Sequence, residues 1–258
     1  MISRFLFVFF ILIAGVGLSA NDKLVVGMEL AYPPFEMTDK QGNPEGLSVD
    51  LAKAFGEYLG REVEIQNIAW DGLIPALKTG KVDVVISSMT ITEEREKTVD
   101  FSEPYSKAYL ALLVSKESPV VDVEDLNKKG RTVAVKKGST GHMYARENLE
   151  EANMLILDKE SSAVLEVVQG RADAFIYDQL TIFRNWKNHQ DATRASLRPF
   201  QEDYEYWGMA FKNGSPLVEK ANDFIKKFRD EGGFDRLAEK HLQEIKKTFE
   251  NQGIPFFL

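Results

Sequence analysis

Ten side chains of this sequence could together hold a small charged molecule. They are polar, charged or aromatic, and they lie in loops that follow short runs of apolar residues. They are Glu29, Tyr32, Trp70, Ser87, Ser88, Thr90, Arg95, Ser139, Thr140 and Asp178. The planar fork of an arginine is the best partner for a carboxylate, and an ammonium group is best held by a carboxylate together with neutral acceptors. The mixture therefore suits a zwitterion better than it suits a bond-breaking reaction.

Most catalytic and metal-binding chemistries lack their side chains in this sequence. There is no cysteine, which excludes thiol nucleophiles, iron–sulfur clusters and cysteine-based zinc sites. The three histidines, His142, His189 and His241, have no metal-ligand spacing, and there is no phosphate-binding lysine loop, dinucleotide glycine pattern or nucleophile elbow. We therefore expect no metal, no cofactor and no catalytic residue. His142 is the one histidine that could face the same site as the ten side chains.

The composition is that of a packed globular protein. Hydrophobic residues make up 44% of the 258 residues and charged residues 28%, which argues against a disordered or fibrous class. The length allows one large domain or two of about 100 to 150 residues. The formal net charge is −8, whereas a nucleic-acid binder needs a basic surface. We expect small molecules or proteins as partners, and no nucleic acid.

Residues 1–20 have the pattern of a secretory signal peptide. Residues 5–18 are all apolar or glycine, Arg4 precedes them, and the small residues Ser19 and Ala20 follow. This run is shorter than the ~20 apolar residues of a membrane-spanning helix and fits a cleaved signal, with an uncleaved anchor as the alternative. No cysteine is present for lipid attachment. We therefore expect cleavage after Ser19 or Ala20 and a soluble product in the periplasm.

The rest of the sequence alternates short β-branched runs with helical patterns, which is typical of an α/β fold with largely parallel sheets. Strands are expected at 23–27 and 62–66, and a helix at 46–60 that ends at Gly60. The pentapeptide GKVDV at 80–84 is echoed by GRADA at 170–174, and each follows an apolar helix and opens a buried strand. This echo indicates two similarly built lobes.

Two extended segments, 109–115 and 206–212, are candidates for the connections between the lobes. With both crossovers, the chain leaves the first lobe and later returns to it. The expected division is lobe 1 at 21–108 plus 207–258, and lobe 2 at 109–206. Ligands of open α/β sheets bind beyond the carboxyl ends of the strands, which is where the ten side chains are expected.

The chain contains, in this order, the segments VVGMELAYPPFE, GLSVDLAKAFG, WDGLIPALKTGKVDVVISSMTITEEREKTVDFSEPY, KKGSTG and GRADAFIYD. This order resembles the periplasmic solute-binding proteins for polar amino acids, that is, extracellular solute-binding protein family 3 with its lysine/arginine/ornithine-, histidine- and glutamine-binding types. The resemblance implies a type II periplasmic binding protein fold, with two similar α/β lobes and a two-strand hinge near 107–110 and 204–208. It also implies a monomeric, non-enzymatic receptor that closes over one L-amino acid and delivers it to an inner-membrane ABC permease.

The resemblance implies a role for each charged side chain. Arg95 would bind the α-carboxylate, helped by Thr90 and by the hydroxyl groups at 139–140. Asp178 would bind the α-ammonium group together with the Thr90 hydroxyl and the Ser88 carbonyl. A buried charge without a partner is very costly, and in this arrangement each charged end of an amino acid would meet a side chain of opposite charge.

Ligand identity depends on the remaining residues. The resemblance places Tyr32 and Trp70 on the two sides of the ligand side chain, and it places Ser87 in a serine-rich turn. Glu29, where many relatives carry Asp, would be left over as a negative group near the side-chain end. This favours lysine or arginine, which the aromatic faces also suit. The longer Glu29 side chain leaves a ligand such as glutamine open.

Ordinary structural roles are the alternatives for four of these residues. Tyr32 and Trp70 could be ordinary core residues. Arg95 could form a surface ion pair with Glu93 or Asp100, and Asp178 could cap the helix that follows it.

An enzyme of the same fold is the alternative function. Cyclohexadienyl or arogenate dehydratases resemble these binders, and such chemistry needs a carboxylic acid with a raised pKa as general acid. Glu29 is a conceivable candidate, but a pocket assigned to a zwitterion has no obvious spare acid. The extracellular sensor module of a receptor is a third possible function, and it would require an attached membrane and signalling region.

Overall fold

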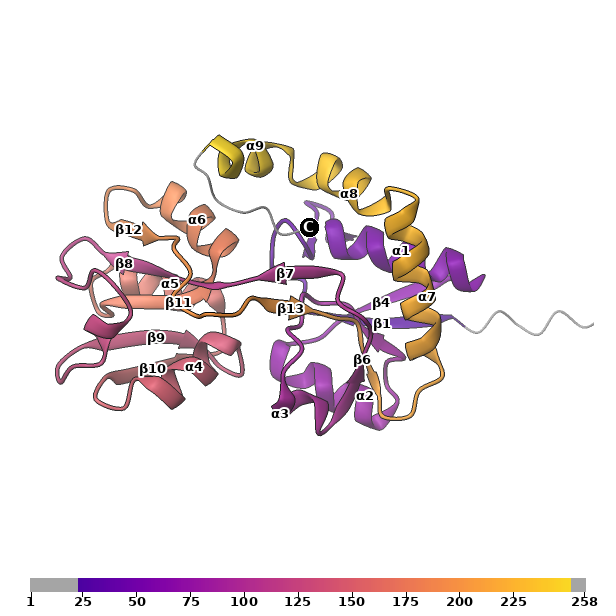
Figure 1. Ribbon diagram of the computed structural model, residues 1–258, viewed down its shortest axis with the longest axis horizontal. Coiled ribbons are helices and arrows are strands. Elements are labelled where there is room, and N and C mark those ends of the chain that lie inside the picture. Colours follow the sequence, from indigo (N-terminus) through magenta and orange to yellow (C-terminus); the bar gives the residue numbers. More distant parts are fainter. Residues whose placement is uncertain (1–22, 252–258) are drawn as a thin grey trace, which may run out of the picture.

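The computed structural model describes residues 23–251, which form two α/β lobes, each built on a five-stranded sheet (Figure 1). The strand order is β4-β1-β5-β14-β6 in the first sheet and β10-β9-β11-β8-β12 in the second. The strands of the first sheet are β1 (Leu24–Met28), β4 (Val63–Asn67), β5 (Val84–Val85), β6 (Val99–Phe101) and β14 (Ala210–Lys212). Those of the second sheet are β8 (Leu110–Ser115), β9 (Thr132–Lys136), β10 (Asn153–Leu157), β11 (Ala174–Asp178) and β12 (Thr193–Ser196).

Each sheet combines parallel and antiparallel strands. β1 runs parallel to β4 and β5, and β9 runs parallel to β10 and β11. The strands β8 and β14, by which the chain enters a lobe after crossing from the other, are antiparallel to their neighbours. The expected parallel arrangement is therefore present among β1, β4 and β5 in the first sheet and among β9, β10 and β11 in the second.

Helices cover the sheets, and their apolar faces supply most of the core. The first lobe carries α1 (Leu47–Leu59), α2 (Leu73–Thr79), α3 (Glu93–Glu96), α7 (Leu217–Asp230), α8 (Gly233–His241) and α9 (Gln243–Asn251). The second carries α4 (Thr140–Asn148), α5 (Glu160–Val168) and α6 (Gln179–Asn188). Short elements are β2 (Met37–Thr38), β3 (Pro44–Glu45) and two 3-10 turns at Trp70–Gly72 and Glu124–Leu126. α1 ends as expected at Gly60, whose φ of 67° is the left-handed conformation that favours glycine.

The two echoed pentapeptides occupy equivalent places in the lobes. Asp83 Oδ2 accepts the backbone N–H of Val25 at 2.9 Å, and Asp173 Oδ2 accepts the backbone N–H of Thr132 at 2.8 Å. Each aspartate thus satisfies the start of the neighbouring strand and also pairs with an arginine. The sequence echo therefore has a structural cause, which is the same carboxylate tie between adjacent strands.

Two short strands carry the chain between the lobes, β7 (Ser106–Ala108) and β13 (Glu205–Trp207), and they pair antiparallel (Figure 1). The segments 109–115 and 206–212 are not the paired connections that the sequence suggested. Most of the first forms the fully buried strand β8, and the second ends as β14. A run that is buried on both faces belongs inside a sheet, whereas the crossover ribbon leaves Tyr206 46% exposed.

The largest apolar cluster contains residues of both lobes. Leu180 and Phe183 of α6 belong to it together with Phe35 of the first lobe and Phe249 of α9. The rings of Phe183 and Phe249 meet edge to face, with centroids 5.5 Å apart. Figure 1 shows α9 reaching from the first lobe towards α6. The C-terminal helix therefore joins the lobes by packing, in addition to the covalent crossovers.

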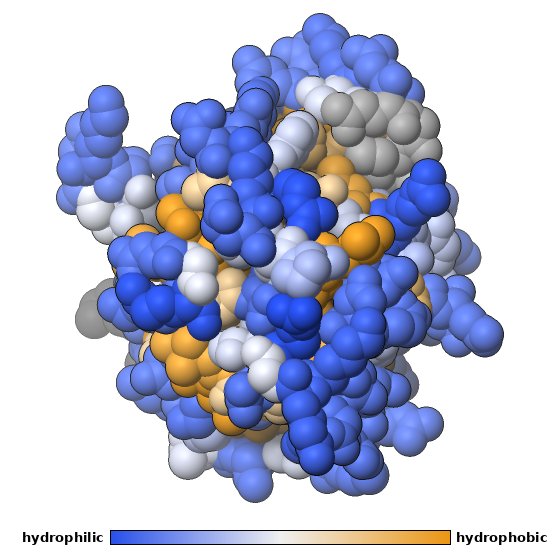
Figure 2. Space-filling view, turned by 90° about the vertical axis from the view of Figure 1, so that its left-hand side faces the viewer, coloured by the Kyte–Doolittle hydropathy of each residue, from blue (hydrophilic) through white to orange (hydrophobic). Residues whose placement is uncertain are grey.

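The outer end of the second lobe has a mainly hydrophilic surface with small apolar patches (Figure 2). Within residues 23–251, no helix combines the length and the apolar character needed to cross a bilayer. The expected signal peptide at 1–20 lies outside the described residues and stays a prediction, as do the lobe boundaries given above.

Candidate ligand-binding site

All ten side chains singled out in the sequence line one pocket, to which both lobes contribute. They come from loops at the carboxyl ends of β1, β5, β9 and β11, from the turn at Trp70, and from α3. Five further residues line it that the sequence analysis missed. They are Glu36, Lys136, Tyr177, Glu205 and Trp207. The open space inside it is about 40 Å³, well below the ~150 Å³ of a cavity that binds benzene. A ligand as large as an amino acid therefore requires the lobes or the lining side chains to move.

Asp178 ends β11 and caps α6. Its Oδ1 accepts the backbone N–H groups of Leu180 and Thr181, each at 3.0 Å. Within the described residues its Oδ2 is buried and has no hydrogen-bond partner. Asp178 can therefore cap the helix and face the pocket at the same time, because Oδ1 accepts the cap hydrogen bonds and Oδ2 remains available. A buried carboxylate oxygen without a donor is costly, so a cationic group brought to it is strongly stabilised.

Arg95 is positioned by the short helix α3, which Thr92 caps by accepting the Arg95 backbone N–H at 3.3 Å. Its side chain is buried and donates to the carbonyls of Thr90 at 2.6 Å and Gly138 at 3.0 Å. Burial lowers its pKa to about 10, which leaves it charged at neutral pH. Among the described residues its guanidinium forms no ion pair with Glu93 or with Asp100, which instead accepts the Gly214 backbone N–H at 2.7 Å. The structure therefore offers a buried cation to the pocket and not a surface ion pair.

The Gly138 carbonyl is a direct contact between the lobes. It accepts from Arg95 and also from Trp70 Nε1 at 3.1 Å. The Gly138 N–H donates to His142 Nδ1 at 3.1 Å. Burial lowers the pKa of His142, which holds this loop in place and does not line the pocket. His142 is therefore a support for the loop.

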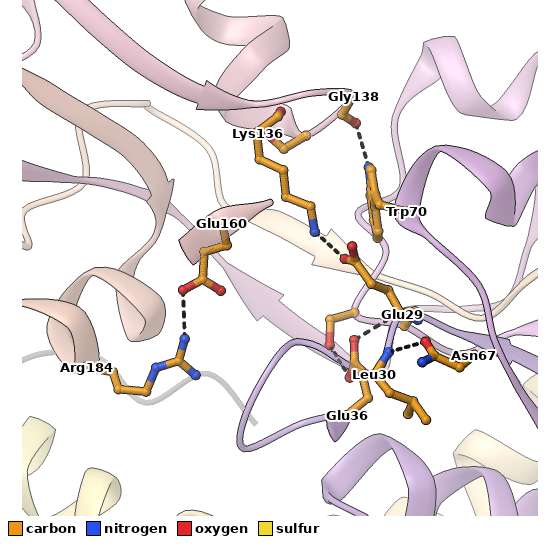
Figure 3. Close-up of polar contacts among 12 residues, drawn as sticks. Glu29, Leu30, Glu36, Asn67, Trp70, Lys136, Gly138, Glu160 and Arg184 are labelled. Atoms are coloured by element: carbon orange, nitrogen blue, oxygen red, sulfur yellow. Dashed lines mark hydrogen bonds and ion pairs between the residues drawn. The ribbon is translucent and has the colours of Figure 1, made fainter. Parts of the chain in front are cut away.

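Lys136 is paired with Glu29 inside the pocket (Figure 3). Lys136 ends β9 and is 3% exposed. Its Nζ also lies 5.1 Å from the centroid of the Trp70 ring. The sequence-based premise that Glu29 stands unpaired is therefore wrong. The pattern could not show this, because Lys136 and Lys137 are adjacent and only the strand's pleat decides which of them points inward.

Two further carboxyl groups, the buried Glu36 and the half-buried Glu205, accept hydrogen bonds from hydroxyl groups that the sequence assigned to a ligand. Glu36 accepts from Ser87 and Ser88, each at 3.1 Å, and burial raises its pKa to about 8. Glu205 Oε2 accepts from Thr140 at 2.9 Å and from Thr90 at 3.4 Å. Burial raises the pKa of Glu205 to about 7.

The pocket therefore contains four carboxyl groups and two basic side chains. The four are Glu29, Glu36, Asp178 and Glu205, and the two are Arg95 and Lys136. Glu36 is protonated near neutral pH and Glu205 titrates near pH 7, so the ionised carboxylates exceed the two cations only when Glu205 has lost its proton. The negative excess that was attributed to Glu29 is a property of the whole set.

Aromatic side chains form one wall. Tyr32 stacks on Phe35 with centroids 5.3 Å apart and meets the edge of Trp207 at 6.2 Å. Tyr32 is nearly buried, and burial raises its pKa well above the ordinary value, so the phenol stays neutral. Within residues 23–251, no group of three or more histidine, aspartate or glutamate side chains is arranged to hold a metal ion.

Comparisons with known proteins give a consistent result. The model of the bacterial extracellular solute-binding proteins, family 3, matches residues 24–244. The arginine-binding extracellular protein ArtP of Bacillus subtilis is 34% identical over 225 residues, which span 86% of this chain and 87% of that protein.

Solved structures extend the likeness to the fold. An ancestral arginine-binding protein bound to arginine has a TM-score of 0.79 at 36% identity, covering 85% of this chain and 98% of the other. The ancestral amino acid-binding protein AncCDT-1, described as a precursor of cyclohexadienyl dehydratase, has a TM-score of 0.76 at 39% identity, covering 85% and 94%. The expected two-lobed type II fold is confirmed.

Proposed function

Because the chain belongs to the bacterial extracellular solute-binding proteins of family 3, we propose that it binds one L-amino acid between its lobes and presents it to the permease of an ABC transporter. One observation carries the proposal. A buried guanidinium from the first lobe and a buried carboxylate oxygen without a partner from the second lobe line the same pocket. Only a ligand with both charges satisfies both groups at once.

The proposed contacts follow from this arrangement. Arg95 binds the α-carboxylate, and Asp178 Oδ2 binds the α-ammonium group. The ligand thereby bridges the lobes and favours their closed arrangement, because it gains contacts to both lobes only there. The direct bonds of the Gly138 carbonyl to the first lobe would add to the closed state.

We propose a cationic side chain for the ligand, of the lysine or arginine type. Carboxyl groups outnumber basic side chains in the pocket, and Trp70 presents a flat face on which a cation already lies. A cation over such a ring gains about 0.5 to 2 kcal/mol. Lys136 competes for the same carboxylate and the same ring, so a neutral ligand such as glutamine, which leaves the Lys136–Glu29 pair intact, is the alternative.

A thermal-shift panel of the twenty amino acids plus ornithine and citrulline tests both statements. A ligand at 100 times its Kd adds about 2.7 kcal/mol, which raises the Tm by roughly 5 to 11 °C for a protein of this size. We expect that rise with arginine or lysine. Arg95→Gln is the control and should lose it. A rise with neutral amino acids alone would contradict the cationic assignment, and no rise with any of them would contradict the function.

One observation favours a second candidate, a dehydratase of the same fold. Glu36 is a buried carboxyl group of the pocket whose pKa of about 8 keeps it protonated at neutral pH, as a general acid requires. It is the spare acid that the sequence analysis did not find. Incubation with prephenate or arogenate separates the two functions, since formation of phenylpyruvate or phenylalanine would replace the binding function by an enzymatic one.

The description of the family places its members outside the cell membrane. We propose that residues 1–20 are a cleaved signal peptide, that the product is a periplasmic monomer, and that the permease is its protein partner. Mass spectrometry of the secreted chain gives the cleavage site, and light scattering of the purified protein gives the oligomeric state.

A further inference from the structure

Glu205 lies on a crossover strand, at the end of the pocket where Arg95 is proposed to bind the α-carboxylate of the ligand. It belongs to β13 and lines the pocket together with Arg95. It also lines two grooves on the outer surface, one of them shared with Thr90 and the other with Thr140. Glu205 is therefore part of the wall between the pocket and solvent.

The bonds of Glu205 reach both lobes. Its Oε2 accepts the hydroxyl of Thr140, at the start of α4 in the second lobe, at 2.9 Å. The same oxygen accepts the hydroxyl of Thr90, in the first lobe, at 3.4 Å. Glu205 also interacts electrostatically with Arg95. A carboxylate of the protein thus uses the groups that a ligand's α-carboxylate would use.

We propose that Glu205 is an internal competitor for the ligand's α-carboxylate, because its negative charge occupies both threonine hydroxyl groups and shares the field of Arg95. This inference rests on the proposed function. An incoming carboxylate would then meet a like charge in a partly buried site, where such repulsion is weakly screened. Protonation of Glu205 removes the repulsion and turns the competitor into a neutral hydrogen-bonding group.

The charged surroundings of Glu205 fix the direction of the effect. Burial has the largest effect and favours the protonated form of Glu205, the hydrogen bond from Thr140, the charge of Arg95 and the hydrogen bond from Thr90 favour the ionised form, and the carboxylate of Asp178 favours the protonated form. The net result is a pKa raised to about 7. The other titratable groups that line the two grooves are Glu93 and Glu94 of α3, Lys97 just after α3, Tyr144 and Glu147 of α4, and Asp203, Tyr204 and Tyr206 of its own segment. A bound carboxylate raises the pKa of Glu205 further, so binding takes up a proton and weakens as the pH rises.

The size of the effect follows from that pKa. Glu205 is about nine-tenths protonated at pH 6 and about one-tenth protonated at pH 8. If only the protonated form accepts the ligand, the association constant falls about tenfold between these pH values. At pH 7, binding should take up about half a proton.

Calorimetry at pH 6, 7 and 8 with the strongest amino acid from the panel tests the proposal. In Glu205→Gln we expect an association constant that changes little with pH and exceeds that of the unmodified protein about tenfold at pH 8. The amide still accepts from the threonines but carries no charge. Glu202→Gln, an exposed carboxylate of the same segment, is the matched control and should keep the original pH profile.

Proton uptake by the unmodified protein, measured in buffers of different ionisation enthalpy, needs no variant. Uptake near half a proton at pH 7 supports the proposal, and zero uptake overturns it. An unchanged pH profile in Glu205→Gln, or weaker binding than the unmodified protein at pH 8, also overturns it. Binding by the unmodified protein that does not vary from pH 6 to 8 overturns this inference and leaves the proposed function intact. Absence of binding at every pH contradicts both.

Discussion

Replacing Asp178 by asparagine separates its two tasks. The asparagine Oδ1 can continue to accept the N–H groups of Leu180 and Thr181, and asparagine is as good a helix cap as aspartate. The other position changes from a buried carboxylate oxygen without a partner into an N–H donor. An α-ammonium group would then meet a donor and no compensating charge. The substitution should therefore leave the fold intact and remove the anionic half of the proposed site.

The expected loss is large. A buried charge whose partner has been removed costs about 3 to 5 kcal/mol, which corresponds to a roughly hundredfold to several-thousandfold weaker Kd. Asp178→Ala loses the cap as well, which costs about 1 kcal/mol and lowers the Tm by roughly 2 to 4 °C. The alanine variant should thus be less stable, whereas the asparagine variant should melt like the unmodified protein.

Calorimetry with the strongest ligand of the panel measures the first effect, and thermal unfolding without ligand measures the second. A Kd for Asp178→Asn within threefold of the original would refute the assignment of this carboxylate to the ligand. If Asp178→Asn lost as much binding as Asp178→Ala and its Tm also fell by a large amount, the residue would act through the fold alone.

Other predictions concern the remaining pocket groups. Lys136→Met frees Glu29 and the Trp70 ring, so arginine should bind about tenfold more tightly relative to glutamine; an equal change for both ligands in calorimetry would count against this. Trp70→Phe keeps an aromatic ring but loses the hydrogen bond to the Gly138 carbonyl. This loss of about 1 kcal/mol should weaken ligand binding about fivefold. An unchanged Kd would show that the hydrogen bond does not contribute to closure of the lobes. Glu36 has a folded pKa of about 8, above its unfolded value of 4.5, so the stability it contributes is complete below pH 4.5 and is lost as the pH rises towards 8. Thermal unfolding of Glu36→Gln should therefore show a flatter decline of Tm between pH 5 and 8, and a parallel decline would contradict the raised pKa.

The sequence predicted the membership of the pocket well, for a simple reason. Loops that follow neighbouring parallel strands converge at one edge of a sheet, so polar residues placed after β1 and β5, such as Glu29 and Ser87, had to lie near one another. The motif order added the second lobe, which brings in residues such as Thr140.

The missed residues depend on tertiary approach. Lys136 reaches Glu29 only because the lobes face each other, and the two residues are 107 positions apart in the chain. Glu205 enters the site because a crossover strand, and not a loop after a sheet strand, passes its edge. Glu36 lies beyond the first loop's aromatic residues and is turned inward by its bonds to Ser87 and Ser88. The pairing of carboxyl groups with hydroxyls and amines thus could not be obtained from spacing.

The packing of α9 on α6 has a consequence for how the molecule melts. Phe183 and Phe249 belong to an apolar cluster that also holds much of the first lobe's core. Unfolding of α9 would expose apolar surface on both lobes at once. Without α9, the apolar cluster shared by the two lobes would be open to water. Heating should consequently produce a single cooperative transition in place of two, with calorimetric and van 't Hoff enthalpies in agreement.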